Sequence, residues 1–176
     1  MNILLPGRVL VVPDIDSQRW DAVCQLACQG ETLGVGRSIP PGQTPPGFRQ
    51  ANEVATILAD GFRSGDFAYA SDPAYSDVWQ SPARTLAMGI GDCEDWAIFI
   101  FALLQRTSAS AQFCIGTVNG VGHAWVEVVD EAGWALIECT SGMVFRRGRP
   151  QSYRLELIVE LRGYKRVTPR LVRRAM

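Results

Sequence analysis

Three residue types that together perform nucleophilic chemistry follow one another along the second half of the chain: a cysteine, a histidine and an acid. Cys93 lies in GDCEDWAIF, His123 in GHAWVEVV and Glu138 in GWALIECT. A thiol can attack a carbonyl carbon, an imidazole can take the thiol proton, and a carboxylate can hold the imidazole in the productive tautomer. His123 is the single histidine of the sequence. The pattern therefore predicts a Cys93–His123–Glu138 triad.

The acids beside Cys93 mark the start of a helix. Asp92, followed three residues later by Asp95 and an apolar run, is close to a capping box, so we expect Cys93 to be the first helical residue. Because a helix turns about 100° per residue, Glu94 and Asp95 are expected to be rotated away from the thiol. The helix dipole would favour the thiolate by roughly 0.3 to 1 kcal/mol. An imidazolium about 4 Å away would add about 4 kcal/mol, against about 1 for each solvated carboxylate. The sequence thus predicts that Cys93 alkylates fast near about pH 6.

The histidine and the glutamate are expected on neighbouring strands. If DEAG (130–133) closes a four-residue hairpin loop, His123 lies opposite Thr140, and Glu138 is its diagonal neighbour on the same face. A register shifted by one residue would turn Glu138 to the other face. The remaining candidates for the orienting group would then be Asn119, Glu127 and Asp130.

The elements that would position these residues form two groups. Helices are predicted over residues 17–29 and 49–63, near Pro82, and from Cys93 onward. Strands rich in β-branched and aromatic residues are predicted at 113–119, 122–130, 133–140 and 152–162. The last strand alternates, with one face predicted to carry Tyr153, Leu155, Leu157, Val159 and Leu161. Helices first and consecutive strands afterwards predict an α+β domain with a mostly antiparallel sheet.

Length and composition predict a single domain. The 176 residues are enough for one hydrophobic core, which we assign to residues 1–167, followed by a basic tail over 168–176. No stretch reaches the roughly 18 to 20 apolar residues of a membrane span. The N-terminus lacks the features of a secretion signal, and five cysteines are an odd number at irregular spacing. A cytoplasmic location without a membrane partner is therefore expected.

Two further features have competing explanations. Cys24 and Cys28 suggest a metal site, but they share a predicted helix face with Trp20, and the chain lacks a second cysteine pair to complete a zinc site. Core packing is favoured, and zinc in the purified protein would support the alternative. From Arg146 onward ten basic residues face two acidic ones, a net charge of +8 that leaves −9 for the preceding residues. No nucleic-acid motif accompanies this basic end, so a nucleic-acid partner is not expected.

The stretch from about Tyr75 to Gly142 resembles the transglutaminase-like cysteine peptidases, and within them the bacterial transglutaminase-like cysteine proteinases. The resemblance is carried by WQSPARTL, GDCEDWA, GHAWVEVV and WALIECT. It implies a papain/transglutaminase-like core, with its motif-bearing part over 75–162, in which the nucleophile helix packs on an antiparallel sheet. It also implies attack of the thiol on an amide carbonyl, with release of the acyl-enzyme by water or by an amine.

The resemblance extends to the remaining site residues, with one departure. The third position is usually an aspartate, and here it is Glu138. The oxyanion hole is expected to use the Cys93 backbone N–H, with Trp79 or Gln80 as a second donor. No cofactor is expected except calcium, for which the candidate ligands are Asp92, Glu94 and Asp95.

Together these features predict a cysteine-dependent hydrolase that cleaves a peptide or isopeptide bond in a protein or peptide substrate. The alternatives are a protein-glutamine acyltransferase, which would pass the acyl group to an amine, and a catalytically silent binding module with the same fold.

Overall fold

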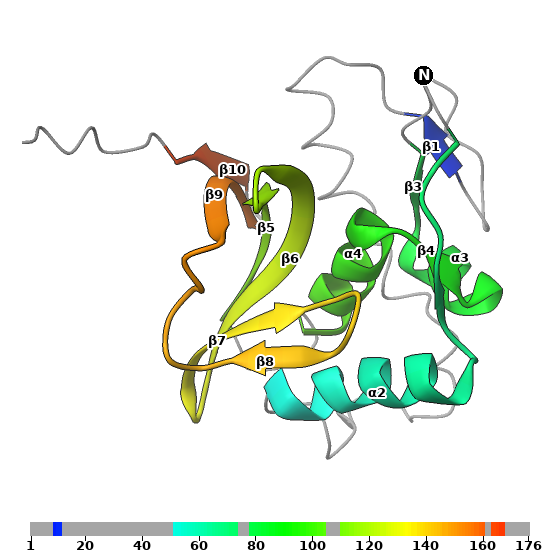
Figure 1. Cartoon of the computed structure of the whole chain (residues 1–176), viewed down its shortest axis with the longest axis horizontal. Coiled ribbons are helices and arrows are strands. Elements are labelled where there is room, and N and C mark those ends of the chain that lie inside the picture. The colour runs from blue at the N-terminus through cyan, green and yellow to red at the C-terminus, as the bar shows by residue number, and fades with distance from the viewer. Residues whose placement is uncertain (1–8, 12–50, 74–77, 105–109, 161–162, 168–176) are drawn as a thin grey trace, which may run out of the picture.

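The structure is a computed structural model that describes residues 9–11, 51–73, 78–104, 110–160 and 163–167. Its helices and strands form two groups along the chain (Figure 1). The first group consists of α2 (Ala51–Ser64), β2 (Ala68–Tyr69), β3 (Val78–Gln80), α3 (Pro82–Met88), β4 (Ile90–Gly91) and α4 (Cys93–Leu104). The second consists of β5 (Ser110–Val118), β6 (Val121–Asp130), β7 (Gly133–Glu138), β8 (Met143–Phe145), β9 (Tyr153–Glu160) and β10 (Gly163–Arg166).

The second group builds a six-stranded sheet in the order β10-β9-β5-β6-β7-β8. Every neighbouring pair in this sheet is antiparallel. The predicted α+β class is confirmed, and β5, β6, β7 and β9 lie at the four predicted strands. The sequence missed β8 and β10, which have only three and four residues and so carry little alternation.

Two short pairings lie outside this sheet. β1 (Val9–Val11) runs antiparallel to β3, and β2 runs parallel to β4. Tyr69 is the register partner of Gly91 in the second pairing. The β2–β4 pair therefore ends beside the start of α4.

Helix α4 lies against the sheet (Figure 1) and is buried all round. Of its residues only Glu94 is partly exposed, and all the others are at most 8% exposed. A helix that is apolar on every face belongs inside a core. Trp96 contacts the rings of Phe62, Phe67 and Phe99, and donates its indole N–H to the Gly91 carbonyl at 3.1 Å. These contacts fix the first turn of α4 in place.

Among the described residues, helices α2 and α3 lie where the sequence predicted them. α2 buries the face that carries Val54, Leu58 and Gly61. α3 begins at Pro82, and the Ser81 hydroxyl accepts a hydrogen bond from the Arg84 backbone N–H as an N-cap. Pro82 and Thr85 of α3 are buried, and Ala83 and Leu86 pack against the main core. The helix that precedes Cys93 therefore belongs to the same core as α4.

The prediction for β9 is wrong in one respect. A β-bulge shifts the β5–β9 register between Ile115 and Gly116, so that Ile115 pairs with Leu157 and Gly116 with Leu155. Leu157 and Val159 belong to the main core, whereas Tyr153 and Leu155 pack in a second cluster around Trp125. The strand therefore changes face at the bulge. Leu161 is outside the described residues.

Several sequence predictions also concern residues that the structure does not describe. These are the helix over 17–29 with Cys24 and Cys28, and the basic tail over 168–176. In the part of the chain that is described, no helix has both the length and the hydropathy needed to cross a bilayer.

Candidate active site

Cys93 is the first residue of α4, as predicted. The Asp95 backbone N–H donates to Asp92 Oδ1 at 3.4 Å, and the Asp92 backbone N–H donates to Asp95 Oδ2 at 3.3 Å. This reciprocal pair is the capping box that the sequence indicates, and it satisfies two backbone donors at the helix start. The sequence between Asp92 and Asp95 thus places the thiol at a helix N-terminus.

The environment of the thiol differs from the prediction. Cys93 is only 8% exposed, and its Sγ donates to Glu94 Oε2 at 2.8 Å. Burial, followed by the charge of Glu94 and the hydrogen bond to it, raises the pKa of the Cys93 thiol. The expectation that Glu94 is rotated away is wrong, because its flexible side chain reaches back to the preceding residue. The resting group is a protonated thiol.

The thiol also contacts the strand that carries the histidine. The backbone N–H of Ala124, in β6, forms a hydrogen bond with Cys93 that partly offsets the rise in its pKa. Ala124 directly follows His123 in the strand. The start of α4 and strand β6 are therefore in contact next to His123 in the chain.

His123 and Glu138 form a hydrogen-bonded pair, in the register that the hairpin loop predicts. Asp130 pairs with Gly133, and each later pair down to Val126 and Ile137 keeps the register in which His123 would face Thr140. The His123 Nε2 lies 2.8 Å from Glu138 Oε2 and 3.0 Å from Oε1. The side chains of both residues are mostly buried, at 18% and 11% exposed. The imidazole is thus held through one ring nitrogen.

Two further residues bind the Glu138 carboxylate, and the sequence did not indicate either in this role. The Tyr153 hydroxyl donates to Oε2 at 2.6 Å. Thr140 donates to Oε1 through its backbone N–H at 3.2 Å and through its hydroxyl at 2.8 Å. Burial alone would raise the pKa of Glu138, but hydrogen bonds from His123, Tyr153 and Thr140 lower it to about 2. Glu138 is therefore an anion at neutral pH.

The acids that could have replaced Glu138 are engaged elsewhere. Glu127 accepts hydrogen bonds from the indoles of Trp125 and Trp134, at 3.0 and 3.3 Å, and pairs with Arg149. Asp130 pairs with Arg146 at 2.9 Å. The third candidate, Asn119, has a φ of 52° in the turn between β5 and β6. Of the four candidates, Glu138 is the one that hydrogen-bonds the imidazole in the described part of the chain.

The structure gives Trp79 and Gln80 other contacts than those expected of oxyanion donors. Gln80 donates its backbone N–H to Asp95 Oδ1, and its side-chain amide to Asp95 Oδ2 and to the Ile90 carbonyl. Trp79 is 1% exposed and packs against the Phe113 ring. Gln80 thereby holds the Asp95 carboxylate at the start of α4. The Cys93 backbone N–H stays as the predicted oxyanion donor.

The three acids around Cys93 have different surroundings. Burial, and then the charges of Glu94 and Asp95, raise the pKa of Asp92 to about 8. Burial raises the pKa of Asp95 to about 6 despite its hydrogen bonds from Gln80. Across the described ranges, no group of three or more His, Cys, Asp or Glu side chains has the geometry of a metal site. As arranged here, Asp92, Glu94 and Asp95 do not form a calcium cage.

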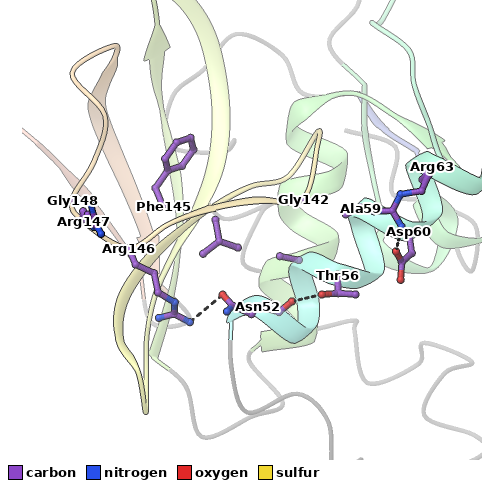
Figure 2. Close-up of a pocket in the computed structure, with 12 residues that line it drawn as sticks. Asn52, Thr56, Ala59, Asp60, Arg63, Gly142, Phe145, Arg146, Arg147 and Gly148 are labelled. Atoms are coloured by element: carbon purple, nitrogen blue, oxygen red, sulfur yellow. Dashed lines mark hydrogen bonds and ion pairs between the residues drawn. The ribbon is translucent and has the colours of Figure 1, made fainter.

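A groove of about 730 Å³ lies away from these residues, between α2 and the chain around β8 (Figure 2). Across it Arg146 reaches Asn52 Oδ1 at 3.3 Å, and farther along α2 Arg63 pairs with Asp60. None of Cys93, His123 and Glu138 lines it. The groove is therefore separate from the candidate active site.

Comparison with known proteins agrees with this arrangement. Residues 36–139, more than half of the chain, match the model of the transglutaminase-like superfamily. No curated protein matches the chain in sequence.

The fold is similar to that of Legionella pneumophila LapG. The EGTA-treated form aligns with a TM-score of 0.56 at 16% identity, over 90% of this chain and 81% of that chain. A second LapG structure gives 0.53 at 16% identity, over 88% and 81%. The calcium-bound form gives 0.50 at 16% identity, over 90% and 86%. At this level of identity the likeness concerns the fold.

Proposed function

Because the chain belongs to the transglutaminase-like superfamily, we propose that it is a cysteine-dependent hydrolase acting on a peptide or isopeptide bond. In this proposal Cys93 is the nucleophile, His123 the general base and acid, and Glu138 the group that orients His123. The observation that carries it is the His123–Glu138 pair on β6 and β7, with the Cys93 thiol against the residue next to His123.

The tautomer of His123 follows from its partner. A carboxylate only accepts hydrogen bonds, so the Nε2 that faces Glu138 carries the proton, and Nδ1 of the neutral ring has a free lone pair. The thiol proton passes to Nδ1 as the sulfur bonds to the carbonyl carbon. His123 then returns this proton to the nitrogen of the leaving amine as the C–N bond breaks.

Water completes the cycle. It loses a proton to His123 and attacks the thioester carbon, and the S–C bond breaks to release the acid and restore the thiol. The Cys93 backbone N–H, at the positive end of the α4 dipole, stabilises the oxyanion in both steps. The thiol donates to Glu94 at rest, so the S–H must turn toward His123 before the first step.

An activated ester tests the proposal without knowledge of the substrate. Intact-mass and peptide mapping after a pulse of p-nitrophenyl acetate should find an acetyl group on Cys93, and the acetyl group should turn over with time. His123→Ala should abolish this acylation, while Cys114→Ser should leave it unchanged because Cys114 is fully buried. Acylation at the same slow rate in the parent and in His123→Ala would contradict the proposal.

A second candidate, the silent binding module, is favoured by one observation. The raised pKa of the Cys93 thiol and its hydrogen bond to Glu94 describe a group that is protonated at neutral pH. This candidate predicts that Cys93 does not acylate in the parent protein. The same ester experiment therefore separates the two functions.

The acceptor of the acyl group distinguishes hydrolysis from transfer. Water as acceptor gives a hydrolase, whereas a primary amine gives the acyltransferase that the sequence leaves as an alternative. Turnover of acetyl-Cys93 with and without a lysine analogue measures the partition. We expect acetate as the main product.

Calcium has no role in the proposed mechanism, and its binding is tested separately. Carboxylate oxygens are the ligands that calcium prefers, but Asp95 is held by Gln80 and Glu94 by the thiol, so no step above uses the ion. Thermal unfolding and Cys93 acylation are compared in calcium and in EGTA. A melting temperature raised by calcium in the parent, but not in Asp92→Asn, would assign a calcium site to this turn.

A further inference from the structure

The Glu138 side chain reaches His123 with more freedom than a single contact can restrain. Three side-chain torsions separate the carboxylate from the backbone, so one hydrogen bond to an imidazole would leave several rotamers open. In the structure both oxygens are nevertheless fixed. The contacts of each oxygen define which residues do this.

Each carboxylate oxygen of Glu138 has a donor besides His123. Oε2 accepts the Tyr153 hydroxyl at 2.6 Å and lies 2.8 Å from His123 Nε2. Oε1 accepts both donors of Thr140. Hydrogen bonds to an ionised acceptor are short and roughly twice as strong as neutral ones. Thr140 lies just after β7, and Tyr153 is the first residue of β9. The carboxylate is thus held by donors from two separate parts of the chain.

Tyr153 also contacts the imidazole. Its ring lies edge-on to the His123 ring at 6.3 Å between centroids, and edge-on to Trp125 at 5.3 Å. Trp125 in turn stacks on His123 at 6.3 Å, with 22° between the ring planes. The aromatic cluster therefore bounds the imidazole while the hydroxyl of Tyr153 binds its partner.

A backbone feature brings Tyr153 close to this pair. Gly116 lies on β5 at the β-bulge. Its register partners are His123 on β6 and Leu155 on β9. A Cβ on Gly116 would lie 1.9 Å from the Arg154 carbonyl oxygen and 3.0 Å from the Trp125 ring. Glycine at this position lets β9 approach, and the bulge turns Tyr153 to the face that carries His123 and Glu138.

We propose that Tyr153, with Thr140 as second donor, is a positioning residue that holds the Glu138 carboxylate against His123 Nε2. The inference rests on the proposed function for its consequence in catalysis, but the arrangement itself can be measured without catalysis. The Tyr153 hydroxyl acts through Glu138, to which it donates its hydrogen bond. The hydroxyl, rather than the ring, is the part that matters.

The test uses Tyr153→Phe in the full chain, which keeps the ring and removes the hydroxyl. We expect Cys93 acylation by p-nitrophenyl acetate to fall about tenfold, the effect of losing one hydrogen bond to a charged group. Thr140→Val should lower it similarly, and Thr140→Ser should restore it. Phe145→Leu is the matched control, because Phe145 packs on Tyr153 at 6.0 Å between ring centroids without a hydrogen bond to Glu138.

Proton NMR of the imidazole gives a second measurement, which would not change if Tyr153 had only a structural role. The chain has one histidine, so a downfield Nε2–H signal is assigned without ambiguity. We expect this proton to be protected in the parent and in Phe145→Leu, and to exchange faster in Tyr153→Phe and Thr140→Val. If Tyr153→Phe does not fold, Thr140→Val carries the test.

The outcomes separate the two proposals. An unchanged Nε2–H signal and an unchanged acylation rate in Tyr153→Phe and Thr140→Val would overturn the positioning role. A parent protein that never acylates, but whose Nε2–H loses protection in both variants, would overturn the proposed function and support the positioning role.

Discussion

At the scale of single residues, the Cys93 thiol contacts two groups with opposite effects on its proton. Glu94 accepts the S–H and raises the thiol pKa, whereas the Ala124 backbone N–H lowers it. An imidazole can deprotonate such a thiol only when the thiol no longer donates to the carboxylate. We therefore expect Glu94 to limit how much thiolate forms at Cys93.

Removal of the Glu94 charge should activate the thiol. In Glu94→Gln we expect the Cys93 pKa to fall by at least about one unit, which at neutral pH gives about a tenfold faster reaction with iodoacetamide. Labelling rates at Cys93 across pH, read by mass spectrometry, measure this. Glu131→Gln is the control, because Glu131 is exposed in the β6–β7 turn. Equal pH profiles in the parent and Glu94→Gln would show that the carboxylate does not hold the thiol.

Sequence reasoning indicated the three residues of the proposed triad but not the residues that contact them. Residue types and order indicated Cys93, His123 and Glu138. The length of the β6–β7 loop predicted the strand register that brings His123 and Glu138 together. The position of Glu94 was missed, because the helical angle describes where a side chain starts, not where its flexible end lies. Tyr153 was missed because it belongs to another strand, and sequence separation does not report a contact across a sheet.

At the scale of elements, the β5–β9 bulge brings the aromatic rings of Tyr153 and Trp125 against the His123–Glu138 pair. The Arg154 carbonyl and the Trp125 ring leave no space for a side chain on Gly116. The pattern of β9 in sequence predicted one continuous face, because alternation cannot reveal a residue that a bulge leaves unpaired. The hairpin of β6 and β7, in contrast, is local, and its loop length was enough to predict its register.

A substitution at the bulge should therefore be costly. Gly116→Ala is expected to lower the free energy of unfolding by about 1 to 3 kcal/mol, since the strands must separate to admit a methyl group. Gly122→Ala, in the facing strand, is the matched control because a Cβ there meets nothing within 4 Å. Urea denaturation of both variants measures the difference. Equal stabilities would mean that β9 does not approach Gly116 as closely as described.

At the scale of the whole molecule, buried carboxyls make stability depend on pH in two windows. Glu138 has a pKa lowered to about 2, so its contribution is lost as the pH falls from about 4.5. Asp92 and Asp95 have pKa values raised to about 8 and about 6, so the folded state loses stability as the pH rises from about 4 through these values. The order of helices and strands predicted the α+β class, but not which carboxyls the folded chain buries.

The alkaline window has a specific test. Asp92→Asn removes the buried charge and keeps an N-cap oxygen, so we expect it to gain about 1 to 3 kcal/mol at pH 8 relative to the parent and little at about pH 4. Thermal unfolding across this range measures the effect. A gain that is the same at both pH values would mean that Asp92 does not titrate in this window.

The central claim is that Cys93, His123 and Glu138 act as one unit, and the most direct measurement is the pH profile of Cys93 acylation in Glu138 variants. Glu138→Gln should fold but acylate at least about tenfold more slowly than the parent, because a neutral amide stabilises imidazolium less and can hold the wrong tautomer. Glu138→Asp should be the milder change, since it keeps the charge, and Glu131→Gln should match the parent. Identical rates and pH profiles in the parent and Glu138→Gln would contradict the account by removing Glu138 from the site.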